Sequence, residues 1–372
     1  MIQLKELTTQ KELKQFVKFP FKLYKKNKFW VPPIISDELA SFDKTKNPVF
    51  KHADARFFIA IKEGEIVGRV AAIINHTEVN EQGIKKMRFG WFDFIDNPEV
   101  SKMLIKKVEE IGIQNGLEFM EGPVGFSNMD KVGVLTEGFN HIGTMITWYN
   151  HAYYKTHYNN LGFTPEKEYL ENKFPFENVK PIYFEKISTL VKKRYNLTPI
   201  NFTKSKDIFP YVDEMFDLFN SSYAKLESFV PISEEQKQHF KEKYINFINP
   251  ELIKFVVDKD HKIVAFAITM PSFSEALQKA KGKLFPFGFI HLLRAKKKAK
   301  EIIFYLIGIH PDYQSKGVTA VVFEEYYKSF KEMGVENCIR TPELASNKAI
   351  AAIWKNFDSK TFKKRSTFKK DI

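Results

Sequence analysis

His310–Thr319 reads HPDYQSKGVT and carries the strongest structural signal in the chain. It follows a strongly apolar run, 302–309 (IIFYLIGI), which predicts a buried β-strand. It precedes 318–333, where apolar residues recur at spacings of three and four, as on one face of an α-helix. Gly317 allows a sharp turn between the two, so the first N–H groups of the helix point outward and can bind phosphate. On the loop alone, an ordinary strand-to-helix turn of an α/β domain is the simpler explanation.

The residues that follow favour the phosphate site. After the helix come a Gly, a predicted strand at 335–341 (VENCIRT) and a predicted short helix at 347–357. This order and its motifs resemble the GNAT superfamily of N-acyltransferases over roughly the last seventy residues, and more loosely over the preceding hundred. The matching motif residues are Pro311, Tyr313, Gln314, Gly317 and Asn347.

The resemblance implies a mixed α/β sheet and an acyl thioester as co-substrate, carried by CoA or by an acyl carrier protein, with an amine as acceptor and no metal. Strands 302–309 and 335–341 would be parallel neighbours that splay apart and hold pantetheine between them. A main-chain N–H near Ile307 to Ile309 would bind the thioester oxygen. The implied donor-binding residues are Ile307, Ile309, Gln314, Ser315, Lys316, Gly317, Val318, Thr319, Asn347 and Trp354.

Two residues depart from the GNAT pattern. Thr319 stands where the superfamily usually has Gly or Ala, so a hydroxyl and a methyl group crowd the expected phosphate-binding loop, Gln314–Thr319, called the phosphate loop below. Trp354 stands where many members have a Tyr that protonates the leaving thiolate, and an indole N–H is a very poor acid. We therefore expect another group to act as the acid, or the thiolate to leave without assistance.

The length and composition of the chain limit the possible classes of fold and function. A chain of 372 residues predicts two domains, and its single cysteine, Cys338, excludes a disulfide framework and a cysteine zinc site. The start of the chain predicts a strand and a helix, without a signal peptide, and no apolar run is long enough to span a membrane. The net charge of +13 indicates an anionic partner, among which nucleic acid has the least support. These features predict a cytoplasmic protein.

The first half repeats the GNAT order of strands and helices, and its segment 158–163 (YNNLGF) resembles a superfamily ending. Strand 167–174 is expected to close this unit. The segment 95–100 (IDNPEV) has no glycine and carries two acids where phosphates would lie. We therefore expect 1–175 to be a GNAT-like domain on the acceptor side that has lost donor binding, and 176–372 to hold the donor site. The chain after residue 357 leaves room for one strand, where a full unit has two.

Within the second half, 271–300 is an insertion relative to the superfamily. Its core is 274–300, in which seven large apolar residues at 284–293 are flanked by lysines on both sides. This composition is typical of a segment that lies on a membrane surface. A helical hairpin packed on the other domain, with its lysines solvated, explains the composition equally well. The insertion precedes the predicted thioester strand, so it is also placed to wall an acyl channel.

Motifs along nearly the whole chain support a second resemblance. They include 19–24 (FPFKLY), 30–33 (WVPP), 68–72 (GRVAA) and 282–288 (GKLFPFG). They are similar to a bacterial group of long GNAT-like proteins that includes bacterial ceramide synthases. This implies transfer of a long acyl chain to a lipid amine such as a sphingoid base, with peripheral contact to the inner face of the membrane. Two alternatives stay open: an N-acetyltransferase with a small soluble acceptor, and a non-catalytic acyl-CoA or lipid-binding protein.

The catalytic candidates are polar residues near the expected junction. Glu301 begins the predicted thioester strand, where many GNAT proteins keep a base, although a solvated surface Glu is the simpler explanation. In the first half, Tyr149 and Asn150 are candidates, and each alone is more often structural. Further first-half candidates are Glu121, Ser127, Glu137 and His141.

Overall fold

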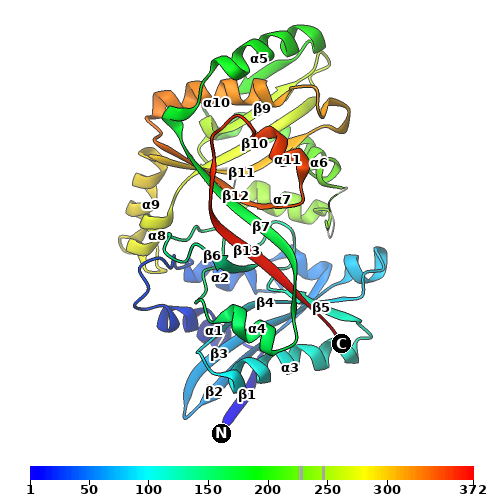
Figure 1. The fold of residues 1–372 in the computed structure, drawn as a ribbon, viewed down its shortest axis with the longest axis vertical. Helices are drawn as coiled ribbons and strands as arrows, with labels where there is room; N and C mark the ends of the chain where they lie inside the picture. Colours follow the sequence, from blue (N-terminus) through cyan, green and yellow to red (C-terminus); the bar gives the residue numbers. More distant parts are fainter. Residues whose placement is uncertain (225, 227–228, 245–247) are drawn as a thin grey trace.

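One mixed β-sheet runs through the whole protein in the computed structural model, which describes residues 1–224, 226, 229–244 and 248–372 (Figure 1). The strand order is β1-β2-β3-β4-β5-β13-β7-β12-β11-β10-β9-β8, and β6 pairs with β13. Parallel pairing occurs between β4 and β5 and between β11 and β12, and the other strand pairs are antiparallel. The predicted mixed α/β sheet is thus confirmed.

The two halves of the chain share a common order of elements, apart from β6 in the first half and α5 and the α8–α9 hairpin in the second. The first half comprises β1 (Ile2–Leu7), α1 (Gln10–Leu23), α2 (Ile35–Ser41), β2 (Ala53–Lys62), β3 (Glu65–Asn75), β4 (Lys86–Phe94), α3 (Pro98–Gln114), β5 (Phe119–Gly122), β6 (Val134–Glu137), α4 (Tyr154–Asn160) and β7 (Thr164–Pro175). The second comprises α5 (Ile182–Tyr195), β8 (Thr198–Asn201), α6 (Val212–Tyr223), α7 (Glu234–Tyr244), β9 (Ile253–Val257), β10 (Ile263–Pro271), α8 (Ser274–Ala280), α9 (Gly288–Lys297), β11 (Glu301–Ile309), α10 (Thr319–Met333), β12 (Asn337–Leu344), α11 (Lys348–Ile353) and β13 (Lys360–Asp371).

The last strands of the two halves are exchanged. The first half's β7 pairs with β12 of the second half, and the C-terminal β13 pairs with β5 of the first half, while β7 and β13 pair with each other. Figure 1 shows them as two long strands that cross from one half to the other. The prediction that 167–174 closes the first unit was therefore wrong, because alternating side chains specify a strand without specifying its neighbour. The strand that the second half seemed to lack is β7.

Core packing follows this exchange. Phe174 on β7 is buried in the core of the second half, where its ring lies 5.3 Å from that of Phe357. Phe368 on β13 is buried in the core of the first half and stacks on Tyr158 at 4.5 Å. Each half thus obtains part of its apolar core from the other. The predicted boundary at residue 175 falls at the end of β7, and the division into two domains stays a prediction.

The insertion forms the hairpin α8–α9 beside the junction (Figure 1). Its inner face packs on the first half, where Leu277 and Leu292 join Val31 in one apolar cluster. Its outer face carries Phe285 and Phe287, which are 76% and 69% exposed. The segment is therefore a packed hairpin and also presents aromatic side chains to the surroundings. No helix in the described part of the chain combines the length and the apolar character that a bilayer crossing needs.

Candidate active site

The predicted splay between two parallel strands is present. β11 and β12 pair only from Glu301 with Asn337 to Phe304 with Arg340, although both strands continue beyond this point. On its other edge β11 has a bulge at Tyr305, where the register with β10 shifts. A bulge bends the strand that contains it and increases its local twist. The bend therefore lies where β11 leaves β12, and a gap opens between them.

Main-chain groups of β11 face this gap. The N–H of His310 donates to the carbonyl oxygen of Val264 at 2.8 Å. Along an antiparallel ladder, residues that bond to the neighbouring strand alternate with residues that point away from it. Ile309 and Ile307 precede His310 by one and three residues, so they turn their N–H and C=O groups away from β10 and toward the gap. These are the two residues from which the sequence predicts a donor to the thioester oxygen.

Hydroxyl groups from the end of α6 also reach the gap. Tyr223 donates to the carbonyl oxygen of Ile307 at 2.9 Å, and Ser222 donates to that of Ile309 at 3.0 Å. The side-chain amide of Gln314 donates to the same Ile309 oxygen at 3.3 Å. Burial raises the pKa of Tyr223 to about 12, so its hydroxyl stays protonated at neutral pH.

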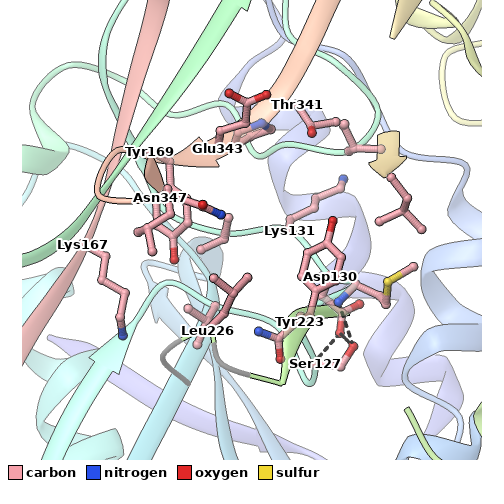
Figure 2. Close-up of a pocket in the computed structure, with 18 of the residues that line it drawn as sticks. Ser127, Asp130, Lys131, Lys167, Tyr169, Tyr223, Leu226, Thr341, Glu343 and Asn347 are labelled. Carbon is pink, nitrogen blue, oxygen red and sulfur yellow. Dashed lines mark hydrogen bonds between the residues drawn. The ribbon is translucent and has the colours of Figure 1, made fainter. Parts of the chain in front are cut away.

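The gap opens into a cavity of about 260 Å³ at the junction of the two halves. Figure 2 shows side chains from both halves around it: Asp130 and Lys131 on a first-half loop, Tyr169 on β7, Tyr223 on α6 and Glu343 on β12. The exchanged strand β7 thus supplies part of its wall. The cavity combines apolar strand residues with charged side chains of both signs.

Glu343 is the cavity carboxylate closest in sequence to the point where β12 leaves β11. Burial raises the pKa of Glu343, although the Nε of Arg340 donates to it at 3.0 Å and partly offsets this effect. The Arg340 guanidinium lies over the ring of buried Trp354 at 4.8 Å. The indole N–H lies near Glu343 without forming a hydrogen bond of ordinary geometry. Trp354 therefore packs against the ion pair at one wall of the cavity.

The phosphate loop leads into α10 with its amides free of side-chain caps. Val318 precedes the helix and makes no capping bond, while Ser315 and Gly317 adopt φ values of 60° and 78°. A second cavity of about 140 Å³ lies at this helix end, and Gly317 and Thr319 line it. Thr319 is thus one of the residues that line this cavity, and crowding of a bound phosphate by its side chain stays a prediction. Lys316 is exposed, with its ammonium 5.4 Å from the ring centre of Tyr195.

In the first half, a side chain of the protein itself caps the start of the corresponding helix, α3. At α3, the side chain of Asn97 accepts from the N–H of Glu99 at 2.9 Å, and Pro98 has no N–H to offer. β4 and β5 also part after three residue pairs, but there the N–H of Val124 donates to the carbonyl oxygen of Phe89 at 2.8 Å. The chain itself therefore fills the first-half gap. Among the described residues, an open gap and a helix start without a side-chain cap occur together at β11 and α10.

The three residues predicted for catalysis are not among those that line this cavity, and Glu301 lies on β11, whereas the adjacent pair Tyr149 and Asn150 lies between β6 and α4. Glu301 is at the paired end of β11 and bonds to Lys173 at 3.0 Å. Tyr149 donates to the carbonyl oxygen of Phe139 and accepts from the amide of Asn27, both at 3.0 Å. Asn150 is buried and bonds through both its oxygen and its nitrogen to the main chain of Leu135. Each makes contacts that hold the local fold.

The other first-half candidates divide between the cavity and the surface. Glu121 and Ser127 line the cavity, whereas Glu137 pairs with Lys364 at 3.0 Å and His141 packs against a phenylalanine ring. Burial alone would raise the pKa of Glu121, but Lys86 and Lys167 outweigh it and lower the pKa to about 2. The side chain of Glu121 therefore stays ionised at neutral pH.

Sequence reasoning missed Asp130, Lys131, Tyr169, Tyr223 and Glu343. They come from a loop, two strands and the end of helix α6, which are far apart in the sequence, so no local motif marks them. Asp130 is open to the cavity yet lies deep between the halves, and loss of hydration raises its pKa. The same effect lowers the pKa of Lys131. The loop before α10 carries a local sequence motif, whereas these residues come together only in the folded protein.

Comparison with known proteins supports this description. No protein-family profile matches the chain. It is 26% identical to Protein YghO of Escherichia coli (strain K12) over 318 residues, which cover 84% of this chain and 79% of that protein. It is 24% identical to a bacterial ceramide synthase of Caulobacter vibrioides over 372 residues, which cover 98% of this chain and 96% of that protein.

Solved structures are similar over the full length of the chain. A tandem GNAT protein from the clavulanic acid biosynthesis pathway superposes with a TM-score of 0.58 at 8% identity, covering 100% of this chain and 98% of that one. A GCN5-related N-acetyltransferase from Sphaerobacter thermophilus gives 0.52 at 9% identity, covering 100% and 95%. The chain therefore has the tandem GNAT fold that its phosphate-loop motif predicts.

Proposed function

We propose that this protein is an N-acyltransferase that moves an acyl group from a thioester to an amine. The observation that carries the proposal is the open gap between β11 and β12, with an uncapped helix start on one side and a shared cavity on the other. A thioester in the gap would present its carbon to an amine in the cavity. The likeness of the fold to GNAT N-acetyltransferases agrees with this reading.

The reaction forms a C–N bond and breaks a C–S bond. A neutral amine attacks the thioester carbon, and the oxygen gains negative charge, which the N–H groups of Ile307 or Ile309 would stabilise. A base then takes one proton from the nitrogen, and the departing thiolate takes up a proton to leave as a thiol. Glu343 is our candidate base, because it borders the cavity and its pKa is raised toward the working range. Tyr223 is our candidate proton donor to the thiolate.

The donor site would extend from the gap to the phosphate loop. Gln314 to Thr319 and the start of α10 would bind the phosphates of CoA or of a carrier-protein arm. Asn347 caps α11 through the N–H of Ile350 at 3.2 Å and lines the cavity with Trp354, so both would shape the wall beside the thioester. The contacts of Glu301, Tyr149 and Asn150 support positioning roles for these residues.

For the acceptor, we propose an amine of a lipid, such as a sphingoid base, acylated with a long chain. The similarity to a bacterial ceramide synthase over nearly the whole chain supports this choice, though at only 24% identity. The exposed phenylalanines of the α8–α9 hairpin, beside a row of lysines, support peripheral contact with an anionic membrane on its cytoplasmic face. The cavity's modest volume and charged lining favour the second candidate, transfer of a short acyl group to a small polar amine.

One experiment separates these possibilities. The purified protein is incubated with hexadecanoyl-CoA or acetyl-CoA and with either a sphingoid base or a panel of soluble amines. Thiol release and the mass of the amide product are measured. We expect thiol release that requires both hexadecanoyl-CoA and the sphingoid base. Acetylation of soluble amines alone would establish the second candidate, and tight acyl-CoA binding without any product would establish a non-catalytic binding protein.

A further inference from the structure

Helix α5 exposes a stripe of large apolar side chains. Ile182, Tyr183, Ile187 and Leu190 are 51%, 48%, 45% and 69% exposed, while the opposite face of the helix packs along α10. The last three recur at spacings of four and three, so they share one face. An apolar face of this kind on a surface helix usually marks an interaction site.

The stripe adjoins the phosphate loop. Tyr183 and Ile187 line the second cavity together with Gly317 and Thr319. A Cβ atom at Gly317 would lie only 3.2 Å from the Ile187 side chain, which shows how closely α5 approaches the loop. A molecule bound on the stripe would therefore sit at the entrance of the donor site.

Positive charge surrounds the stripe. Lys180, Lys186, Lys193 and Arg194 are exposed on or beside α5, and the helix has one acidic residue, Glu185. Lys316 adds a further exposed cation on the phosphate loop. An apolar centre with a basic rim is complementary to a partner that has an apolar centre and an acidic rim.

We propose that α5 docks an acidic acyl carrier protein, which delivers the thioester on its phosphopantetheine arm; this inference rests on the proposed N-acyltransferase function. The arm's phosphate would meet the start of α10, and its thioester would enter the gap. The stripe runs for about 12 Å along the helix from Ile182 to Leu190, which is longer than one adenine ring. A membrane seated on the stripe would cover the donor entrance, whereas a carrier protein brings its own arm into it.

The test measures binding without any acceptor present. The three probes are a small acidic carrier protein loaded with a hexadecanoyl thioester, hexadecanoyl-CoA, and vesicles of anionic lipid. The test variants are Ile182→Ser/Leu190→Ser, which removes apolar contacts outside the second cavity, and Lys186→Glu/Lys193→Glu, which reverses charge. The matched control is Ile113→Ser on α3, a side chain that is 58% exposed in the other half. Thermal melting confirms that each variant is folded.

We expect both α5 variants to weaken carrier-protein binding about tenfold or more, the size expected from central interface residues. Binding of hexadecanoyl-CoA should stay the same, and Ile113→Ser should leave both unchanged. Failure of the wild type to bind the loaded carrier overturns the docking proposal. An equal loss of CoA binding in the α5 variants would instead make the stripe a nucleotide subsite, and a loss of vesicle binding would make it a membrane contact.

The two proposals fail separately. Carrier binding without transfer to any amine would refute the acyltransferase function and leave the docking surface in place. If the protein transfers an acyl group from acyl-CoA but does not bind the carrier, the docking proposal is refuted and the acyltransferase function stands.

Discussion

The hydroxyl of Tyr223 donates to the main-chain oxygen of Ile307 at 2.9 Å, inside the gap where β11 leaves β12. This contact places a protonated phenol beside the strand that would hold the thioester. By its resemblance to GNAT proteins, Trp354 stands where many members have a tyrosine, and an indole N–H is a very poor acid. Tyr223, from a different helix, is therefore our candidate proton donor.

Replacing Tyr223 with Phe tests this role. We expect kcat to fall about 100-fold, in line with the loss of a general acid, while donor affinity changes little. Loss of the hydrogen bond should lower the free energy of unfolding by about 1 kcal/mol. Steady-state kinetics and thermal melting measure the two effects. Full activity in a folded Tyr223→Phe protein would rule out proton donation by this residue.

Glu343 should govern the acidic limb of the pH profile. Burial raises its pKa, and a base acts only when deprotonated, so activity should be lost as the pH falls through this raised value. The limb should thus lie above the range of an ordinary glutamate. Glu343→Gln should lower kcat about 100-fold and flatten the limb. An unchanged profile in the Gln variant would assign the limb to another group, such as Asp130.

Donor binding should depend on the second half alone. Gly317→Glu places bulk and negative charge at the phosphate loop and should abolish CoA binding, measured by calorimetry. Because Gly317 has φ of 78° and lies close to Ile187, Gly317→Ala serves as the control for backbone strain. The matched first-half change, Asn97→Ala at the start of α3, should leave CoA binding intact. Loss of CoA binding in Asn97→Ala would contradict a single donor site.

Trp354 should contribute packing rather than chemistry. Trp354→Phe keeps a ring under Arg340 and should cost little turnover. Trp354→Ala leaves a cavity among Phe304, Phe323 and Phe357 and should lower the free energy of unfolding by about 3–5 kcal/mol. Denaturant unfolding gives the second number. A large drop in kcat for a stable Phe variant with normal donor affinity would show that the indole takes part in the reaction.

The outer face of the α8–α9 hairpin should bind anionic membranes. Phe285, Phe287 and Phe289 are exposed, so replacing all three with Ser should leave the melting temperature nearly unchanged. Each nearby lysine contributes about 1 kcal/mol at an anionic surface, so vesicle binding should weaken with added salt. The triple variant should bind vesicles more weakly than the wild type. Its transfer activity should fall more with long-chain than with short-chain acyl donors. If the triple variant sediments with vesicles as well as the wild type does, the proposed membrane contact of this face is wrong.

Local patterns predicted the strand and the helix on either side of the phosphate loop accurately. The strand at 302–309, the loop and the helix at 318–333 correspond to β11 and α10 within a residue, because each has its own apolar period and a glycine between them. The junction could not be predicted in this way. Whether β7 pairs with β5 or with β12 depends on contacts between distant segments, and the cavity residues follow from that pairing. Asp130 and Lys131 lie in a loop that has no periodicity at all.

The ladder between β7 and β13 also limits how this protein can move. It runs from Lys173 with Lys360 to Thr164 with Lys369, and it continues into the sheets of both halves. A hinge motion that separated the two halves would break main-chain hydrogen bonds along this ladder. We therefore expect substrates to enter and leave the cavity without any large separation of the two halves.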